Sequence, residues 1–256
     1  FNQSWSWRVE HAYTEVLPSY FNLTRQVASQ DVDLIVWPEY ALPLDVRRNL
    51  TLAYSLEALA REVNTSLLIG SVFYEKFSDT KTQQDVALFV SPTKGIEKVY
   101  RAQKPFYFET GVFPGNETVL LSVGGHTFTI IICNEELTES IAREGAQKGA
   151  SFFVSLVNDQ GMEDSAGLYL TNLFAAMRAA ENGRPLLRTS NTGITQVLDF
   201  QGRTQKTIPL QQSTYLITSI MPRQSETPFT HYGDLFFFLT LGGASIFMFR
   251  KRVTVS

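Results

Sequence analysis

The sequence predicts a single α/β domain, in which strands are interleaved with helices, followed by an apolar segment near the C-terminal end. Apolar, β-branched runs alternate with longer amphipathic stretches, which is the pattern of this fold class. No internal repeat, low-complexity tract or Pro-rich linker divides residues 1–220. With 256 residues, of which 44% are hydrophobic, the chain is long enough to bury a substantial core.

The predicted elements follow one another along the chain. Two runs, FTIIIC and SFFVSLV, are continuously apolar, which is typical of strands covered on both faces. The run ITQVLDFQGRTQ predicts a hairpin that turns at Gln201-Gly202. We expect strands at 33–38, 66–74, 85–91, 119–123, 128–133, 151–157, 185–190, 194–200 and 214–221, and helices at about 11–29, 51–63, 137–148 and 165–182.

Composition disfavours several classes of function. The chain has 22 Lys and Arg residues against 25 Asp and Glu residues, a net charge of -3, so no excess positive charge is present to bind nucleic acid. One cysteine and three scattered histidines give no zinc-ligand spacing, and we therefore expect no metal site. The phosphate-binding patterns GxxxxGK[ST] and GxGxxG are absent, which disfavours a nucleotide cofactor.

The end of the chain differs from the rest. The run LFFFLTLGGASIFMF (235–249) has no charged residue, and it is bounded by Asp234 and by the basic triplet RKR (250–252). As a helix it rises about 22 Å, so it is either a buried terminal helix or a short membrane span. The basic triplet favours a transmembrane helix with a cytoplasmic C-terminus. We expect residues 231–256 to form this helix and its basic tail, with residues 1–230 on the extracytoplasmic side.

The only cysteine, Cys133, ends the run FTIIIC and is followed at once by the polar stretch NEELTESIAREGAQKGA. A thiol at this point lies where a buried strand meets a helix N-terminus, whose N–H groups and dipole favour the thiolate and therefore suit a nucleophile. The alternative is a small apolar residue at the end of a core strand. The residues alone leave both interpretations open.

Further polar residues follow other predicted strands. Glu39 comes directly after a predicted buried strand in VWPEYALP. A carboxylate there is either a general base or a solvated charge on a loop. Lys104 and Glu109 lie among aromatic residues in YRAQKPFYFETGVFPG. A cysteine that attacks an ester or amide carbonyl needs a base for its proton, and the tetrahedral intermediate needs positive charge at its oxyanion. Glu39, Lys104 and Cys133 supply these groups without histidine. Taken alone, Lys104 is equally explained as a surface charge.

The order of these motifs resembles the nitrilase, or carbon-nitrogen hydrolase, superfamily. Within it the sequence is most similar to the family of bacterial apolipoprotein N-acyltransferases. The resemblance covers nearly the whole chain, and its specificity comes from several motifs in the right order before an apolar C-terminal segment. The motifs are VWPEYALP (36–43), IICNEEL (131–137), LVNDQG (156–161), MRAAENGRPLLRTSNTGITQVLDFQGR (177–203) and TPFTHYGDLFF (227–237).

The resemblance implies a nitrilase-like αββα sandwich, with the family's first core strand largely missing from this sequence. It implies that Glu39 is the general base, Lys104 the oxyanion stabiliser and Cys133 the nucleophile that becomes acylated. Glu135 matches an acidic residue that the family needs around the nucleophile, and Glu109 is the candidate for its second active-site glutamate. At the position after the nucleophile, where the family usually has an aromatic residue, this chain has Asn134.

The implied reaction transfers an acyl chain in two steps. Cys133 takes the chain from a phospholipid as a thioester, and the free α-amino group of a diacylglyceryl-cysteine at a lipoprotein N-terminus then accepts it. No metal or organic cofactor is needed. The implied location is the inner (cytoplasmic) membrane, with the catalytic domain on the periplasmic side. Two alternatives remain open: a nitrilase-type amidase that uses water as acceptor, and an inactive extracytoplasmic binding module.

Overall fold

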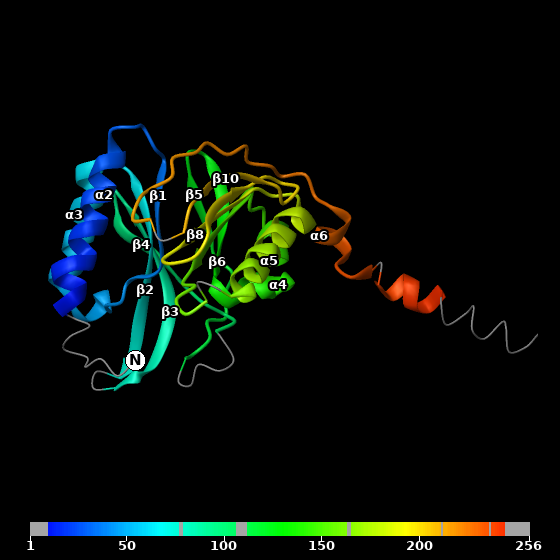
Figure 1. Cartoon of the computed structure of the whole chain (residues 1–256), viewed down its shortest axis with the longest axis horizontal. Helices are drawn as coiled ribbons and strands as arrows, with labels where there is room; N and C mark the ends of the chain where they lie inside the picture. The colour runs from blue at the N-terminus through cyan, green and yellow to red at the C-terminus, as the bar shows by residue number, and fades with distance from the viewer. Residues whose placement is uncertain are drawn as a thin grey trace, which may run out of the picture.

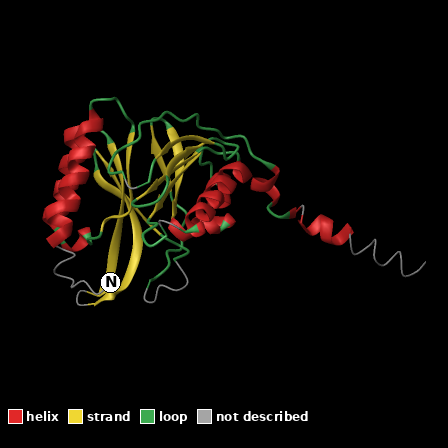
Figure 2. Cartoon of the chain, viewed as in Figure 1, coloured by secondary structure: helices red, strands yellow, loops and turns green. Residues whose placement is uncertain are grey.

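Two β-sheets face each other, and helices cover their outer faces (Figures 1 and 2). The computed structural model describes residues 10–76, 79–105, 112–162, 165–210, 212–235 and 237–243. One outer face carries α2 (Leu17–Ala28) and α3 (Leu50–Val63), and the other carries α4 (Glu139–Gln147) and α5 (Ala166–Asn182). The expected αββα sandwich is therefore confirmed.

The first sheet has the order β1-β2-β3-β4. Strand β1 pairs parallel with β2, and the remaining pairs are antiparallel. The register between β1 and β2 shifts between Trp37 and Leu42, so a bulge that contains Glu39 lies outside the regular ladder. The strands are β1 (Leu34–Leu42), β2 (Ser66–Lys76), β3 (Asp79–Ser91) and β4 (Gly95–Arg101).

The second sheet has the order β10-β9-β8-β7-β6-β5. Its central strands β6, β7 and β8 are parallel, and the outer pairs are antiparallel. The carboxyl ends of parallel strands meet at one edge of a sheet, and the loops that follow them form sites there. The strands are β5 (Leu120–Val123), β6 (His126–Ile132), β7 (Phe152–Val157), β8 (Leu186–Ser190), β9 (Thr195–Leu198) and β10 (Thr204–Ile208).

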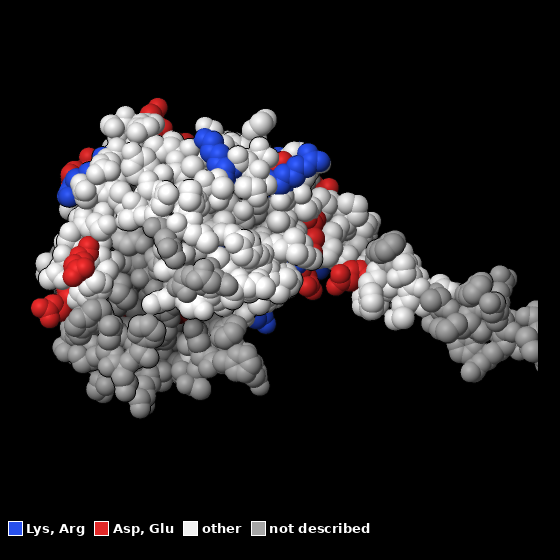
Figure 3. All heavy atoms as spheres, in the orientation of Figure 1, with Lys and Arg blue, Asp and Glu red and all other residues white. Residues whose placement is uncertain are grey.

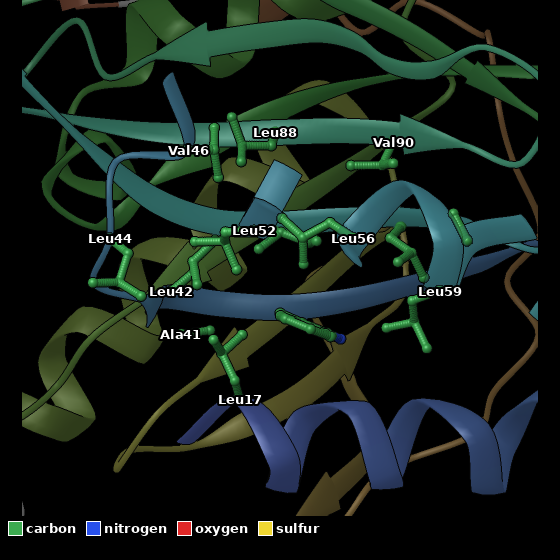
Figure 4. Close-up of a cluster of buried hydrophobic side chains, with 14 of the residues drawn as sticks. Leu17, Ala41, Leu42, Leu44, Val46, Leu52, Leu56, Leu59, Leu88 and Val90 are labelled. Carbon is green, nitrogen blue, oxygen red and sulfur yellow. The ribbon is translucent and has the colours of Figure 1, made fainter. Parts of the chain in front are cut away.

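Three apolar clusters separate the four layers. One packs α2 and α3 against the first sheet, and its side chains lie between these helices and the strands in Figure 4. A second fills the space between the sheets, and a third packs α4 and α5 against the second sheet. Strand β6 serves two clusters, because Ile130 and Ile132 face the other sheet whereas Ile131 faces the helices. This explains why its sequence is continuously apolar.

Most predicted elements are confirmed, with shifts at their ends. The hairpin at Gln201-Gly202 joins β9 to β10, where the Asp199 carboxylate accepts hydrogen bonds from the backbone N–H groups of Gln201 and Arg203. The helix predicted at 137–148 begins only at Glu139, because the short 3-10 helix η3 (Cys133–Leu137) comes first. Strand β4 and the short helix α6 (Pro228–Tyr232) were not predicted.

The strand predicted at 214–221 is wrong, because these residues have no regular secondary structure. A strand needs a hydrogen-bonded neighbour, and this segment instead borders an open groove of about 1410 Å³. The lining of the groove also includes residues of β1, which is the edge strand of the first sheet in the described structure. Alternating apolar residues predict a strand, but they do not supply its partner.

The predicted transmembrane helix is described only in part, up to residue 243. Residues 237–243 are helical. Within the described residues, no helix combines the length and the apolar character that crossing a membrane requires. In this terminal part the described Phe237, Phe238 and Leu239 are between 59% and 65% exposed.

Charged side chains are dispersed over the described surface that Figure 3 shows. Lys and Arg lie singly or in small groups on this face, with Asp and Glu between and beside them. The net charge of -3 agrees with this mixture. On this face, the arrangement gives no basic stripe of the kind that follows a phosphate backbone.

We predict that Gly70→Ala destabilises the protein. Gly70 on β2 passes the β1 bulge so closely that a Cβ would lie 2.1 Å from the carbonyl oxygen of Pro38 and 2.6 Å from Cα of Glu39. The overpacking should lower the free energy of unfolding by about 1–3 kcal/mol, measured by urea denaturation. The matched control is Gly242→Ala, where a Cβ would meet nothing within 4 Å. Equal stability of the two variants would contradict the close approach.

Candidate active site

Three distant segments of the chain meet at one small cavity of about 50 Å³. The β1 bulge contributes Glu39, the loop after β4 contributes Lys104, and the end of β6 contributes Cys133. Asp85 of β3 and Asn158, which follows β7, also line the cavity. The three residues that the sequence analysis selected are thus brought together, whereas Glu109 lies outside the described residues.

Cys133 is the first residue of η3 and has a φ of 46°. A non-glycine residue in this left-handed region is strained by about 1–3 kcal/mol, and such strain is concentrated at functional sites. The turn brings the thiol to the carboxylate of Glu39, to which it donates a hydrogen bond. The backbone N–H of Asn158 also points to the sulfur. The strained turn therefore holds the thiol against a carboxylate and a peptide donor.

The pKa of the Cys133 thiol is raised well above its usual range. Burial is the main cause, and the negative charges of Glu39 and Glu136 add to it. The expected stabilisation of the thiolate by a helix N-terminus is therefore wrong for the free thiol, because η3 is only five residues long and two carboxylates lie nearby. The thiol therefore holds its proton more tightly than an exposed cysteine does, and a base in contact with it would increase its reactivity.

Glu39 is the carboxylate that accepts the hydrogen bond of this thiol. Its side chain is buried, with 5% exposure, and its Oε2 accepts a hydrogen bond of 2.7 Å from the backbone N–H of Asn158. Its backbone carbonyl oxygen accepts a hydrogen bond from the side-chain amide of Asn191, whose Oδ1 in turn accepts one from Tyr20. These contacts fix both the bulge and the carboxylate.

Lys104 lies at the outer side of the cavity, and its residue is exposed. Its backbone is fixed at two points: its N–H donates to the carboxylate of Glu135, and its carbonyl oxygen accepts from Nδ2 of Asn134 at 3.2 Å. Asn134 also donates to the carbonyl oxygen of Pro105 at 3.3 Å. Asn134 thus ties the lysine loop to the turn of Cys133.

Glu135 is fully buried and connects the parts of the site. Its carboxylate accepts hydrogen bonds from the Tyr100 hydroxyl at 2.7 Å and from the backbone N–H groups of Gln103 at 2.6 Å and Ile132 at 2.7 Å, as well as from Lys104. Burial raises its pKa to about 7, and these donors oppose that rise. Glu135 is a positioning residue that joins the lysine loop to the cysteine turn.

Sequence reasoning missed a buried cluster of charges behind the cysteine. Arg188 contacts Glu136 through Nε at 3.0 Å and Asp159 through Nη1 at 3.1 Å, and all three side chains are at most 2% exposed. Ser155 donates to Glu136 at 2.6 Å. Burial raises the pKa of Glu136, and the charge of Arg188 partly offsets this rise. A charged residue that interrupts a run predicted to be buried, as in PLLRTS, was the available signal.

Asn158 was also missed as an individual residue, although the stretch LVNDQG was noted. Its contribution to the cysteine and glutamate contacts comes from the backbone N–H, which any residue except proline supplies. Among the part of the chain that the structure describes, no three His, Cys, Asp or Glu side chains gather as metal ligands. The chemically active groups that line the cavity are the carboxylates of Glu39 and Asp85, the thiol of Cys133 and the amine of Lys104.

Comparison with protein families settles the relationship. The carbon-nitrogen hydrolase family matches residues 4–227, which is most of the chain. The chain belongs to the carbon-nitrogen hydrolase family of enzymes. The matched stretch contains Glu39, Lys104 and Cys133, which the structure gathers at one cavity.

Curated proteins that are similar to this carbon-nitrogen hydrolase are named apolipoprotein N-acyltransferase. The protein from Geobacter metallireducens is 27% identical over 254 residues, which cover 91% of this chain and 48% of the relative. The protein from Vibrio cholerae is 28% identical over 260 residues, which cover 91% of this chain and 50% of the relative. The chain therefore spans about half the length of the curated relatives that it matches.

Similar solved structures share the carbon-nitrogen hydrolase fold. An amidase from Nesterenkonia sp. AN1, solved with acrylamide added at its active-site cysteine, has a TM-score of 0.65 and 15% identity. The match covers 76% of this chain and 82% of the amidase. At this identity the likeness describes the fold, which is the αββα sandwich.

We predict that Glu135 makes stability depend on pH near neutrality. Its pKa rises from 4.5 in the unfolded chain to about 7 in the folded one, so the folded state binds the proton more tightly. The contribution is fully present below pH 4.5 and is lost as pH rises to about 7, a change of roughly 3 kcal/mol. Urea denaturation across this range should show the free energy of unfolding of wild type falling relative to that of Glu135→Gln.

The control for this prediction is Glu62→Gln. Glu62 is an exposed carboxylate whose pKa is lowered by its hydrogen bond with Arg25. The stability it contributes is present above its unfolded pKa and is lost as pH falls, which is the opposite trend. A constant difference between wild type and Glu135→Gln from pH 5 to pH 8 would contradict the role assigned to burial.

Proposed function

We propose that residues 1–230 form the catalytic domain of an apolipoprotein N-acyltransferase, which moves an acyl chain from a phospholipid to the N-terminal amine of a lipoprotein. The observation that carries this proposal is the hydrogen bond from the Cys133 thiol to the buried carboxylate of Glu39, in the cavity that Lys104 also lines. The names of the relatives support the choice of substrates.

The first half of the reaction loads the cysteine. Glu39 takes the thiol proton while the sulfur of Cys133 attacks the ester carbonyl carbon of the phospholipid. The ammonium group of Lys104 stabilises the oxyanion of the tetrahedral intermediate. The carbon–oxygen bond then breaks, Glu39 returns the proton to the leaving alcohol oxygen, and a lysophospholipid departs. The acyl chain remains on Cys133 as a thioester.

In the second half, the acceptor amine attacks the thioester carbonyl carbon. Glu39, again a carboxylate, takes a proton from the attacking nitrogen and delivers it to the sulfur as the carbon–sulfur bond breaks, so the amide forms and the Cys133 thiol is regenerated. The high pKa of this thiol makes the bare thiolate a poor leaving group, so proton return from Glu39 is needed here. One carboxylate therefore serves as base in loading and as acid in release.

The proposed location is the inner (cytoplasmic) membrane, with the catalytic domain on the periplasmic side and residues 231–256 as a transmembrane helix and basic tail. The exposure of the apolar residues Leu235, Phe237, Phe238, Leu239 and Leu241, between 41% and 65%, supports an apolar environment for this segment. The basic triplet RKR (250–252) supports a cytoplasmic C-terminus.

We predict that the purified protein forms a thioester on Cys133 when it is given phospholipid in detergent micelles. Intact-mass spectrometry should show the added mass of one acyl chain on wild type and none on Cys133→Ala. Neutral hydroxylamine should remove the added mass, which distinguishes a thioester from an amide. Lys104→Ala should slow loading, because the oxyanion loses its cation.

The absence of any acyl adduct on wild type would overturn the acyltransferase proposal and leave the inactive binding module. Formation of the adduct followed by release of free fatty acid, without transfer to a lipopeptide amine, would instead favour the nitrilase-type amidase. Both enzymes form the same thioester, and they differ only in whether an amine or water accepts the acyl group.

We predict that Glu39→Gln slows alkylation of Cys133 by iodoacetamide at neutral pH, by about tenfold or more. The direction of the change in alkylation rate distinguishes two roles of Glu39, as a negative charge and as a base. If Glu39 acted only through its charge, its removal would lower the pKa of the thiol and speed alkylation. As the base, its removal slows alkylation. Intact-mass spectrometry over time measures the rate.

Glu136→Gln is the matched control, since Glu136 also raises the pKa of Cys133 through its charge but forms no hydrogen bond with the thiol in the described structure. This variant should react faster than wild type, and the native fold is checked by circular dichroism. Faster alkylation of both variants would remove Glu39 from the role of base.

A further inference from the structure

The cavity holds a second carboxylate, Asp85, that the loading of Cys133 does not use. Asp85 lies on β3, on the sheet opposite the cysteine, and its residue is 4% exposed. It lines the same cavity of about 50 Å³ as Glu39 and Cys133. Its place in this cavity and its burial require an explanation, because an isolated carboxylate is costly to bury.

Tyr40 orients the carboxylate of Asp85. Its hydroxyl donates to Oδ1 of Asp85 at 2.7 Å and accepts a hydrogen bond from the side-chain amide of Gln83. Because the hydroxyl has one proton and the amide donates to it, that proton points to Asp85. Gln83 and Asp85 are two residues apart on one strand and therefore share a face of the sheet. Asp85 is therefore the acceptor at the end of a chain of hydrogen bonds that runs from Gln83 through Tyr40.

The backbone of Tyr40 is itself specialised. Tyr40 follows Glu39 directly and has a φ of 56°, in the left-handed region that non-glycine residues rarely adopt. This conformation costs about 1–3 kcal/mol, and the surrounding contacts must maintain it. The same bulge therefore delivers the base to Cys133 and the tyrosine to Asp85.

Among the described residues, the Asp85 carboxylate accepts a hydrogen bond from Tyr40 alone, at Oδ1. Burial raises the pKa of Asp85, and the hydrogen bond from Tyr40 only partly opposes this rise. A cation that enters the cavity would supply the missing charge and donor together, through a charge-assisted hydrogen bond. The acceptor brings such a group to the acyl enzyme after the lysophospholipid has left, since an α-amino group is largely protonated near neutral pH.

We propose that Asp85, oriented by Tyr40, binds the primary ammonium group of the acyl acceptor beside the thioester and takes its first proton. This inference rests on the proposed function and deepens it by assigning the acceptor site. The alternative role, orientation of a water molecule for hydrolysis, is an outcome of the test below.

The protons balance over the transfer step. The ammonium group gives one proton to Asp85, and the neutral nitrogen attacks the thioester carbonyl carbon. As the carbon–sulfur bond breaks, Glu39 takes the second proton from nitrogen and delivers it to the sulfur of Cys133. The amide keeps the third hydrogen, and Asp85 releases its proton to solvent. Two carboxylates are thus used because an ammonium group must lose two protons.

The test compares two nucleophiles on the preloaded acyl enzyme. The acceptor is a peptide with an N-terminal diacylglyceryl-cysteine, whose amine is charged, and the comparison is hydroxylamine, which is uncharged at neutral pH. For Asp85→Asn, we expect the ratio of the peptide rate to the hydroxylamine rate to fall by about ten- to a hundredfold, the effect of losing one hydrogen bond to a charged group. Tyr40→Phe should lower the same ratio less, because it disorients the carboxylate without removing it.

Glu97→Gln is the matched control. Glu97 is a carboxylate on the neighbouring strand β4 that pairs with Lys94 and is not among the residues that line the cavity. For Glu97→Gln, the ratio of the peptide rate to the hydroxylamine rate should equal that of wild type. Because both rates come from one acyl enzyme, a folding defect lowers the amount of that enzyme without changing the ratio.

Three outcomes decide between the hypotheses. An unchanged ratio in Asp85→Asn would overturn the amine site while leaving the acyltransferase intact. A selective loss of fatty-acid release, with the ratio unchanged, would assign Asp85 to water. Failure of wild type to form any acyl enzyme would overturn the proposed function itself, so the two failures are distinguishable.

Discussion

The buried carboxylate of Glu135 is the interaction on which the arrangement of the site depends. Its acceptor positions are occupied by a tyrosine from β4, by two successive peptides of the lysine loop and by the last peptide of β6. These groups belong to different sheets, so one side chain fixes the distance between the cation and the thiol. A charged group at this depth is unfavourable unless its partners satisfy it, which explains why so many peptide N–H groups converge there.

The β1 bulge and the turn at Cys133 together concentrate both strain and negative charge. Cys133 and Tyr40 have left-handed backbones, and Glu39, Glu135 and Glu136 carry carboxylates into a small buried volume. Arg188, which contacts Glu136 and Asp159, is the cation that compensates this charge from behind the strands. Removing one member of such a cluster typically costs about 3–5 kcal/mol, because the others are left uncompensated. The scaffold thus stabilises conformations that the isolated turn would not adopt.

The fold could be predicted because hydrophobic periodicity depends on local sequence. Continuous apolar runs in β6 and β7 and amphipathic stretches in α3 and α5 gave the layers nearly in full. The segment 214–221 shows the limit of such prediction. Its apolar residues alternate as in a strand, but a strand forms only where another strand lies beside it to share hydrogen bonds. Glu39 and Cys133 could be selected as candidates because each is a chemically distinctive residue at the end of a predicted strand, and Lys104 because it lies among aromatic residues. Two contacts could not be predicted. The hydrogen bond donated by Asn158 uses only its backbone N–H, and the hydrogen bond from Tyr40 to Asp85 joins residues that are distant in sequence.

The raised pKa of Cys133 changes what the surrounding carboxylates must do. A cysteine with a low pKa stores its reactivity as a free thiolate, and it needs no base for attack and no acid for departure. Here burial and two negative charges raise the pKa of the thiol, so in the proposed reaction each passage of the acyl group onto or off the sulfur requires a proton transfer. Glu39 can carry one proton at a time, and an ammonium acceptor brings one more than Glu39 can accept. A second buried carboxylate in the same cavity would resolve this imbalance, and Asp85, which lines the cavity and is buried, is the group to which we assign this role.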